Sequence, residues 1–263
     1  MERVGSYRLG PLLGEGATGV VYRATDGERD VAVKILRSDD PVARRRFARE
    51  ARLARAADSR HLVPVLEVGD RFIVMPFYGA GTLNDRLRTE QQLSLEETVD
   101  LAAQLGKGLD ALHACGVVHR DVKPSNVLLD GAGTAALADF GLARGADSTQ
   151  LTNDGQVVGT AAYLAPELIA GEDATAASDI YALGCVLYEC LVGEPPFTGR
   201  GAAELGFAHL FEPPPDPRER CPALSAEVAL AVISALTKDP TQRPTSGTAA
   251  ARMLHLAHTA SLR

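Results

Sequence analysis

The stretch HRDVKPSNVLLDGAGTAALADFG, residues 119–141, carries the strongest signal in the chain. It places the carboxylate of Asp121 two residues before the ammonium of Lys123, and it ends with a second carboxylate, that of Asp139. Asn126 lies between them and adds an amide oxygen. A proton acceptor, a cation and two oxygen donors in this order are the groups that phosphoryl transfer requires. The stretch therefore predicts a reaction centre for that chemistry.

Each of these groups has an expected role. Asp121 would orient a substrate hydroxyl and accept its proton, and Lys123 would neutralise charge on the transferring phosphoryl group. Asn126 and Asp139 would hold Mg²⁺, with Mn²⁺ as a substitute, because hard oxygen ligands suit an ion that completes its shell with water and substrate phosphates. The alternative, a polar turn followed by a surface Asp-Phe-Gly loop, leaves the ordered set of groups unexplained.

A glycine pattern lies upstream of this stretch. Gly14, Gly16 and Gly19 precede Val21 as GxGxxGxV between two expected strands, where missing side chains let backbone amides approach phosphate oxygens. Alone the pattern is weak, because a glycine turn in a β-hairpin looks the same. A dinucleotide-binding loop would need a following helix, whereas residues 20–24 predict a strand.

Lys34 closes the apolar run at residues 31–34. An ammonium buried at a strand end needs an anionic partner, and Glu50, on the expected helix that follows, can supply it. Such a pair would orient Lys34 toward two phosphates of a nucleotide. The alternative is an exposed lysine and a solvated glutamate.

Composition limits the class of protein. With 263 residues, 46% of them hydrophobic, the chain can bury a large core in one domain, which we expect to have two lobes. A net charge of −7 argues against general binding to nucleic acid or an anionic membrane but not against ATP. The four cysteines include no CxxC pair, which favours reduced thiols. We find no secretion signal or membrane-spanning run, so a cytoplasmic location is expected.

Hydrophobic periodicity changes along the chain. The expected strands cover residues 7–13, 20–24, 31–36, 63–68 and 72–75, with one helix at 41–57. From Ser94 the pattern is helical, since Ser94 and Glu97 form a capping-box signature. We therefore predict an α+β fold, in which a small antiparallel β lobe with one main helix precedes a larger, mainly α lobe.

The two lobes are expected to form one domain over residues 1–263. The small lobe would cover about 1–75, a hinge 76–81, and the large lobe about 82–263. Because ligand sites favour such junctions, the cleft should lie at the hinge.

Together these motifs resemble the protein-kinase superfamily, and most closely the bacterial eukaryotic-like, Hanks-type serine/threonine protein kinases. The resemblance covers roughly residues 6–258. Gly159, Thr160, Tyr163 and the run 165–167 resemble the end of that family's activation segment. Lys123 with Thr160 matches the serine/threonine-specific pattern, in which the threonine bridges the catalytic aspartate and the lysine. This implies transfer from ATP to seryl and threonyl hydroxyls of proteins.

The resemblance also assigns structural and nucleotide-binding residues. It implies that Asp179 holds the backbone near His119 and Arg120, and that Arg243 pairs with Glu167. The residues implied to surround the adenine are Leu13, Val21, Ala32, Met75 as gatekeeper, Pro76 and Tyr78 of the hinge, and Leu128. Either Thr82 or Asp85 would reach the ribose, and the sequence does not choose between them.

Regulation is expected in the segment after Gly141. Ser148, Thr149 and Thr152 lie there among small and polar residues, so a phosphate on this loop could pair with Arg120 and order it. We expect autophosphorylation, with Thr152 the best-placed acceptor and Thr149 next. The alternative is an unmodified flexible loop.

Six arginines crowd the expected helix at 41–57. They could dock a phosphorylated loop or an activating partner, although such runs are usually solvated faces. Dimerisation through the small lobe is a further expected route to activation. His113 and His209 are expected to pack rather than to bind a ligand.

Two other functions are alternatives to that of a protein kinase. A pseudokinase, which signals by shape alone, would have lost Lys34, Asp121, Asn126 or Asp139, and all are present. A small-molecule phosphotransferase would lack the segment at 165–167. A longer parent chain could make this the cytoplasmic domain of a membrane-anchored receptor kinase.

Overall fold

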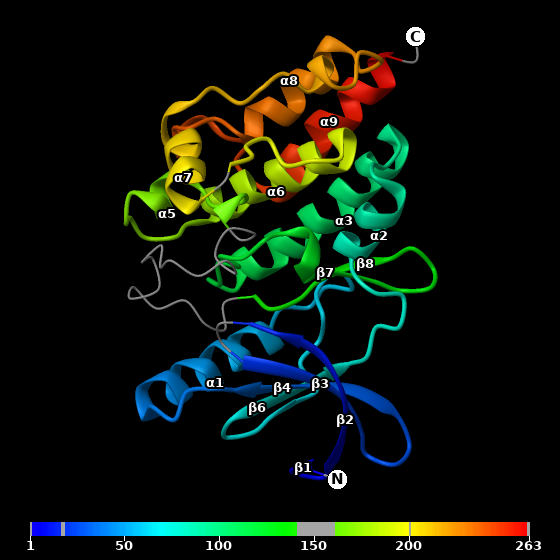
Figure 1. Cartoon of the computed structure of the whole chain (residues 1–263), viewed down its shortest axis with the longest axis vertical. Coiled ribbons are helices and arrows are strands. Elements are labelled where there is room, and N and C mark those ends of the chain that lie inside the picture. Colours follow the sequence, from blue (N-terminus) through cyan, green and yellow to red (C-terminus); the bar gives the residue numbers. More distant parts are fainter. Residues whose placement is uncertain (1, 17–18, 141–160, 200, 262–263) are drawn as a thin grey trace.

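The structure is a computed structural model and describes residues 2–16, 19–140, 161–199 and 201–261. It has a smaller lobe built on one sheet and a larger lobe of helices (Figure 1). The small lobe comes first in the chain and the large lobe follows. This arrangement agrees with the predicted α+β class.

The sheet of the small lobe is antiparallel, with strand order β1-β2-β3-β4-β6-β5. Its strands are β1 (Arg3–Val4), β2 (Tyr7–Glu15), β3 (Gly19–Thr25), β4 (Asp30–Leu36), β5 (Glu67–Val68) and β6 (Phe72–Pro76). The interior strand β4 is buried on both faces, because Val31 and Val33 pack on one face and Ala32 on the other. Strand alternation thus puts Ala32 and Lys34 on the same face.

Helix α1 (Pro41–Arg55) packs through Phe47 and Ala51 against that same face of the sheet. The strand predicted at 63–68 was mostly wrong, since only Glu67–Val68 is extended in the sheet. Pro64 lacks the N–H that a ladder needs. Instead, Val63 N donates to Leu137 O of the large lobe at 2.9 Å.

The large lobe contains α2 (Leu83–Glu90), α3 (Leu95–Ala114), α5 (Pro166–Ile169), α6 (Ala176–Val192), α7 (Ala202–Phe211), α8 (Ala226–Ala235) and α9 (Gly247–Ser261). It also has a hairpin of β7 (Val127–Leu129) and β8 (Ala135–Leu137). The 3₁₀ turns among its described residues are η1 (Pro124–Asn126), η3 (Pro217–Glu219) and η4 (Pro240–Gln242). The Ser94–Glu97 signature does begin α3, because each residue caps the other's backbone N–H.

The core of the large lobe surrounds α6, whose side chains are buried on almost every side. Helices α3 and α9 approach closely, so a Cβ on Gly106 would lie 2.5 Å from Gly247 O. Asp110 of α3 accepts hydrogen bonds from Gly247 N and Thr248 N, at 2.7 and 3.0 Å, and so caps α9. Over the described part of the chain, no helix combines the length and hydropathy that a membrane span requires.

Candidate active site

The residues implied to surround adenine converge where the lobes join. Val21, Ala32, Met75, Tyr78 and Leu128 belong to one apolar cluster. Leu128 reaches it because the backbone of β7 pairs with the end of the hinge. Leu129 N donates to Gly81 O at 3.0 Å, and Thr82 forms a β-bridge with Leu128.

Other members of this predicted pocket lie at its edge. Leu13 is 46% exposed and stands outside the apolar cluster. Pro76 is the last residue of β6, where it pairs with Val31. Thr82 and Asp85 are engaged with each other in a capping box, with Thr82 Oγ1 donating to Asp85 Oδ2 at 2.7 Å. The structure therefore gives both ribose candidates a role in starting α2.

The three glycines of the GxGxxGxV pattern serve different purposes. A Cβ on Gly14 or Gly16 would meet no atom within 4 Å, so both leave open space above the cleft. A Cβ on Gly19 would lie 2.4 Å from Ile35 O, so this glycine is required by the close approach of β4. Residues 17–18 lie outside the described chain.

The loop before η1 brings three predicted catalytic groups together. Lys123 Nζ lies 2.9 Å from Asp121 Oδ2. Asn126 Nδ2 donates to Asp121 O and Asp121 Oδ2, at 2.7 and 2.9 Å. Because its NH₂ group is used in this way, the amide oxygen of Asn126 points elsewhere and can accept a cation.

The second carboxylate joins the same group through the backbone. Ala138 N donates to Asn126 O at 2.8 Å, which fixes the position of Asp139 one residue later. Asp139 Oδ1 is 2.8 Å from Lys34 Nζ, and Lys34 is only 4% exposed. The side chain of Glu50, its predicted partner, lies outside the described residues.

His119 and Phe140 connect the beginning and the end of the stretch at residues 119–141. Their rings are edge to face, with centroids 6.0 Å apart. His119 Nδ1 accepts from Asp121 N at 3.3 Å. Burial lowers the pKa of His119 and outweighs the opposing effect of the Asp179 and Asp121 carboxylates. The ring is therefore neutral at physiological pH and acts as packing between the loops.

Asp179 of α6 fixes the backbone before the catalytic aspartate. Its carboxylate accepts from His119 N at 2.7 Å and from Arg120 N at 2.8 Å. His113 Nε2 is a third partner, at 2.8 Å. These contacts hold Arg120 in the left-handed region, with φ of 68°. Sequence reasoning missed His113, because its partner lies 66 residues away.

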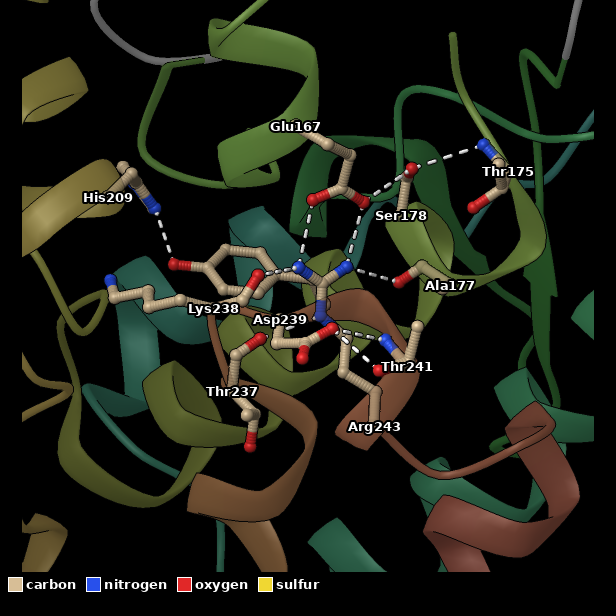
Figure 2. A network of polar contacts seen from close by, with 11 residues as sticks. Glu167, Thr175, Ala177, Ser178, His209, Thr237, Lys238, Asp239, Thr241 and Arg243 are labelled. Carbon is tan, nitrogen blue, oxygen red and sulfur yellow. Dashed lines mark hydrogen bonds and ion pairs between the residues drawn. The ribbon is translucent and has the colours of Figure 1, made fainter. Parts of the chain in front are cut away.

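The Glu167–Arg243 pair lies deeper and is fully satisfied (Figure 2). Two parallel hydrogen bonds of 2.8 Å join the guanidinium to the carboxylate. The remaining N–H groups of Arg243 donate to the carbonyls of Ala177, Thr237 and Lys238. A guanidinium has five N–H groups, and all five are used.

Ser178 is a further partner that the sequence did not suggest. Its hydroxyl donates to Glu167 Oε1 at 2.7 Å. Burial alone would raise the pKa of Glu167, but the hydrogen bonds from Arg243 and Ser178 outweigh it and lower the pKa. Tyr163 is anchored separately, since its hydroxyl donates to Glu189 Oε2 at 2.6 Å. The segment at 161–167 is thus fixed to α6 at several points.

Several predicted residues cannot be placed. Thr160, which was expected to bridge Asp121 and Lys123, lies outside the described residues, as do the expected phosphorylation sites Ser148, Thr149 and Thr152. Among the described residues no group of three or more His, Cys, Asp or Glu side chains could hold a metal ion. A metal bound by Asn126 and Asp139 would therefore take its other ligands from phosphates and water.

Comparison with known proteins agrees with this geometry. A family model described as "Protein kinase domain" matches residues 7–256. The "Serine/threonine-protein kinase PknB" of Mycobacterium leprae is 39% identical over 251 residues, covering 90% of this chain and 40% of the relative. PknB of Mycobacterium tuberculosis is 40% identical over 252 residues, with the same coverage. The "Serine/threonine-protein kinase PknA" of Mycobacterium tuberculosis is 38% identical over 257 residues, covering 92% of this chain and 59% of the relative. The chain thus spans about 40% of the length of its PknB relatives.

Proposed function

The chain belongs to the protein kinase family, as a catalytic domain of the bacterial Hanks type, and on this premise we propose that it transfers the γ-phosphate of ATP to serine and threonine hydroxyls of proteins. One observation carries the proposal. Lys34, Asp121, Lys123, Asn126 and Asp139 come from both lobes and form one connected set of ion pairs and hydrogen bonds at the cleft.

The proposed mechanism is positioning and electrostatic stabilisation. Asp121 receives the proton of the attacking hydroxyl. Lys123, 2.9 Å from that carboxylate, stabilises negative charge on the transferring group. Lys34 now pairs with Asp139, so it must exchange this carboxylate for nucleotide phosphates when ATP binds.

Asn126 and Asp139 fit a magnesium ion. Both offer hard oxygen atoms, and the amide of Asn126 is oriented with its NH₂ group toward Asp121. When bound, the ion would neutralise charge on the phosphates of ATP. Its identity as Mg²⁺ rather than Mn²⁺ is part of the proposal.

We propose that adenine lies in the apolar cluster of Val21, Ala32, Met75 and Leu128, and that Pro76 O and Tyr78 N bind its edge. The position of these residues at the lobe junction supports this. We also propose that residues 1–263 form one catalytic domain with its hinge at 76–81. The end of β6 at Pro76 and the start of α2 at Leu83 support that hinge.

Serine/threonine selectivity would depend on Lys123 and Thr160, and the peptide would lie on the segment at 161–167. The contacts of Tyr163 and Glu167 with α6 and Arg243 support a firm platform there.

We propose regulation by autophosphorylation at Thr152, Thr149 or Ser148. The phosphate would pair with Arg120, and the chain would dimerise through the small lobe. We also propose a cytoplasmic site of action, as part of a membrane-anchored receptor kinase if the parent chain is longer.

Incorporation of radiolabelled phosphate from ATP tests the main proposal. Wild type should label a protein substrate and itself, whereas Lys34→Ala and Asp121→Asn should not. Equal incorporation by all three proteins would refute catalysis and favour the pseudokinase reading.

Phosphopeptide mapping tests the regulatory part. After incubation with Mg-ATP, phosphate should lie on Thr152, Thr149 or Ser148. If the protein labels a substrate but carries no phosphate from Ser148 to Thr152, autophosphorylation of this segment is wrong and the kinase assignment stands.

A further inference from the structure

His209 of α7 is a buried polar residue that the proposed mechanism does not use. It has no exposed surface. Its Nδ1 lies 2.8 Å from the hydroxyl oxygen of Tyr181 on α6, so a hydrogen bond joins the two helices. The imidazole ring also packs edge to face on Phe197, with ring centroids 4.9 Å apart. A buried hydrogen bond between side chains favours one arrangement of the elements that it joins, so this bond fixes α7 against α6.

A second basic side chain holds the neighbouring residue of α7. Lys238, which follows α8, donates from Nζ to Ala208 O at 3.1 Å, and its Nζ lies 4.2 Å above the Phe197 ring. Figure 2 shows Lys238 and His209 on the same side of Arg243. The C-terminal half of α7 is thus bonded to α6 through His209 and to the chain after α8 through Lys238.

Helix α7 in turn supports both ends of the segment at 161–167. At the beginning of the segment, Ala161 shares a small apolar cluster with Leu205 of α7. At its end, a Cβ on Gly206 of α7 would lie 3.6 Å from the side chain of Ile169, the last residue of α5. Because α5 continues the segment, a shift of α7 would be felt along its whole length.

The ring of His209 also lies near the segment itself. Burial and the positive charge of Lys238 lower the pKa of His209 to about 4, and the backbone of Ala162 opposes them. The ring is therefore neutral at physiological pH. Its Nε2 has no hydrogen-bond partner among the described residues, so the contact of Nδ1 with Tyr181 is the hydrogen bond that fixes the ring.

We propose that His209 is a positioning residue for the protein substrate, because it holds α7 in place under the segment at 161–167. The inference rests on the proposed kinase function only for the identity of the ligand that this segment binds. A segment that loses its support spends less time in the arrangement that binds substrate, and the apparent affinity falls in proportion. The proposed nucleotide site lies at the lobe junction, so its affinity should not change.

Hydrogen exchange of backbone amides, followed by mass spectrometry, tests the support of the segment without requiring activity. The variants are His209→Leu and Tyr181→Phe, each of which removes one partner of the hydrogen bond. The matched control is Tyr188→Phe, which removes another hydroxyl of α6, one that lies near Arg220 and Glu194 instead. The rescue variant is His209→Asn, because an asparagine amide can offer a polar atom near the position of Nδ1.

We expect the amides of residues 161–169 to exchange roughly 3–10-fold faster in His209→Leu and in Tyr181→Phe, since one buried hydrogen bond contributes a free energy of this size. The double variant should show no further increase, because both changes remove the same bond. His209→Asn and Tyr188→Phe should exchange like wild type. Tyr181→Phe keeps the ring that packs on Arg243, so it tests the bond even if His209→Leu does not fold. Thermal unfolding checks each variant.

The same proteins are then compared in phosphate transfer from ATP to casein. The KM for casein should rise roughly 3–10-fold in His209→Leu and Tyr181→Phe, whereas the KM for ATP should stay within about 2-fold of wild type. His209→Asn should restore the KM for casein.

Unchanged exchange at residues 161–169 would overturn the inference, as would a lower kcat with both KM values unchanged. The exchange rates decide even for a wild type that labels itself but not casein. If exchange responds as expected but wild type labels no protein, only the proposed function fails.

Discussion

The Lys34–Asp139 pair in the cleft and the Glu167–Arg243 pair in the large lobe both join charges at 2.8 Å, yet they are held differently. Lys34 has one carboxylate partner among the described residues, and the Asp139 side chain is 31% exposed. Arg243 uses all its N–H groups, and its side chain is fully buried. A partly exposed single contact can be exchanged for a ligand, whereas a saturated buried network cannot. We call the region of the first pair the cleft. We call the second pair, together with the packed helices of the large lobe around it, the frame.

Removing Arg243 should have the largest effect on stability. Arg243→Ala leaves the buried Glu167 without its cation, so the free energy of unfolding should fall by about 3–5 kcal/mol. Urea denaturation measures this. The control is Arg218→Ala, which breaks the 2.6 Å pair with Asp216 at a 44% exposed side chain and should change the free energy of unfolding much less. If Arg243→Ala and Arg218→Ala lower the free energy of unfolding equally, the buried pair is no more important for stability than the surface pair.

Packing in the frame should be the next most sensitive feature. Gly106→Ala puts a methyl group against Gly247 O, so α3 and α9 must separate, at a cost of about 1–3 kcal/mol. Gly131→Ala is the control, because a Cβ there meets no atom within 4 Å. If thermal unfolding shows the same change for both, the close contact of α3 with α9 is not what holds the frame.

Lys238 should make the free energy of unfolding depend on pH, by a smaller amount than the two changes above. Its Nζ donates to Ala208 O at 3.1 Å and lies 4.2 Å above the Phe197 ring, and burial lowers its pKa from 10.5 to about 8. Between these values the unfolded chain binds more protons, so the free energy of unfolding should rise with pH, by on the order of 1–2 kcal/mol for this partly exposed group. Urea midpoints at pH 7.5 and 10 measure the rise.

The matched variant for this measurement is Lys238→Met. It cannot titrate, so it should lack this part of the increase. The same pH dependence in both proteins would show that the change comes from other groups.

A change in the cleft should have the smallest effect on stability. Lys34→Met replaces a buried ammonium with an apolar chain of similar size and leaves Asp139 partly hydrated, so unfolding should shift by less than about 1 kcal/mol. Phosphate incorporation should nevertheless be lost. A loss of stability close to that of Arg243→Ala would mean that the cleft is part of the frame.

The residues of the cleft could be predicted because their signal is local. Asp121, Lys123 and Asn126 lie within six positions, and the turn η1 brings them together. Lys34 was predicted to pair with Glu50, and the described partner is Asp139, 105 residues further along the chain. The Glu50 side chain lies outside the described residues, so that pairing stays a prediction, and motif spacing did not indicate the contact of Lys34 with Asp139.

The frame was harder to foresee. Asp179 and Arg243 were assigned only through resemblance to a family, and His113 and Ser178 were not assigned to their networks at all. Their partners lie between 11 and 76 residues away, and no local pattern records such contacts. The strand expected at 63–68 is extended only at Glu67–Val68, and it fails before them for a local reason, since Pro64 has no N–H to pair.

The two left-handed residues of the site have a consequence for folding. Arg120 and Asp139 have φ of 68° and 61°, a conformation that costs about 1–3 kcal/mol for each residue with a side chain. Arg120 remains there because Asp179 accepts its N–H, and Asp179 is in place only when α6 is packed. The backbone geometry of the reaction centre therefore depends on the packing of α6 in the large lobe. A copy in which α6 is not packed would lack this backbone geometry and would therefore be inactive.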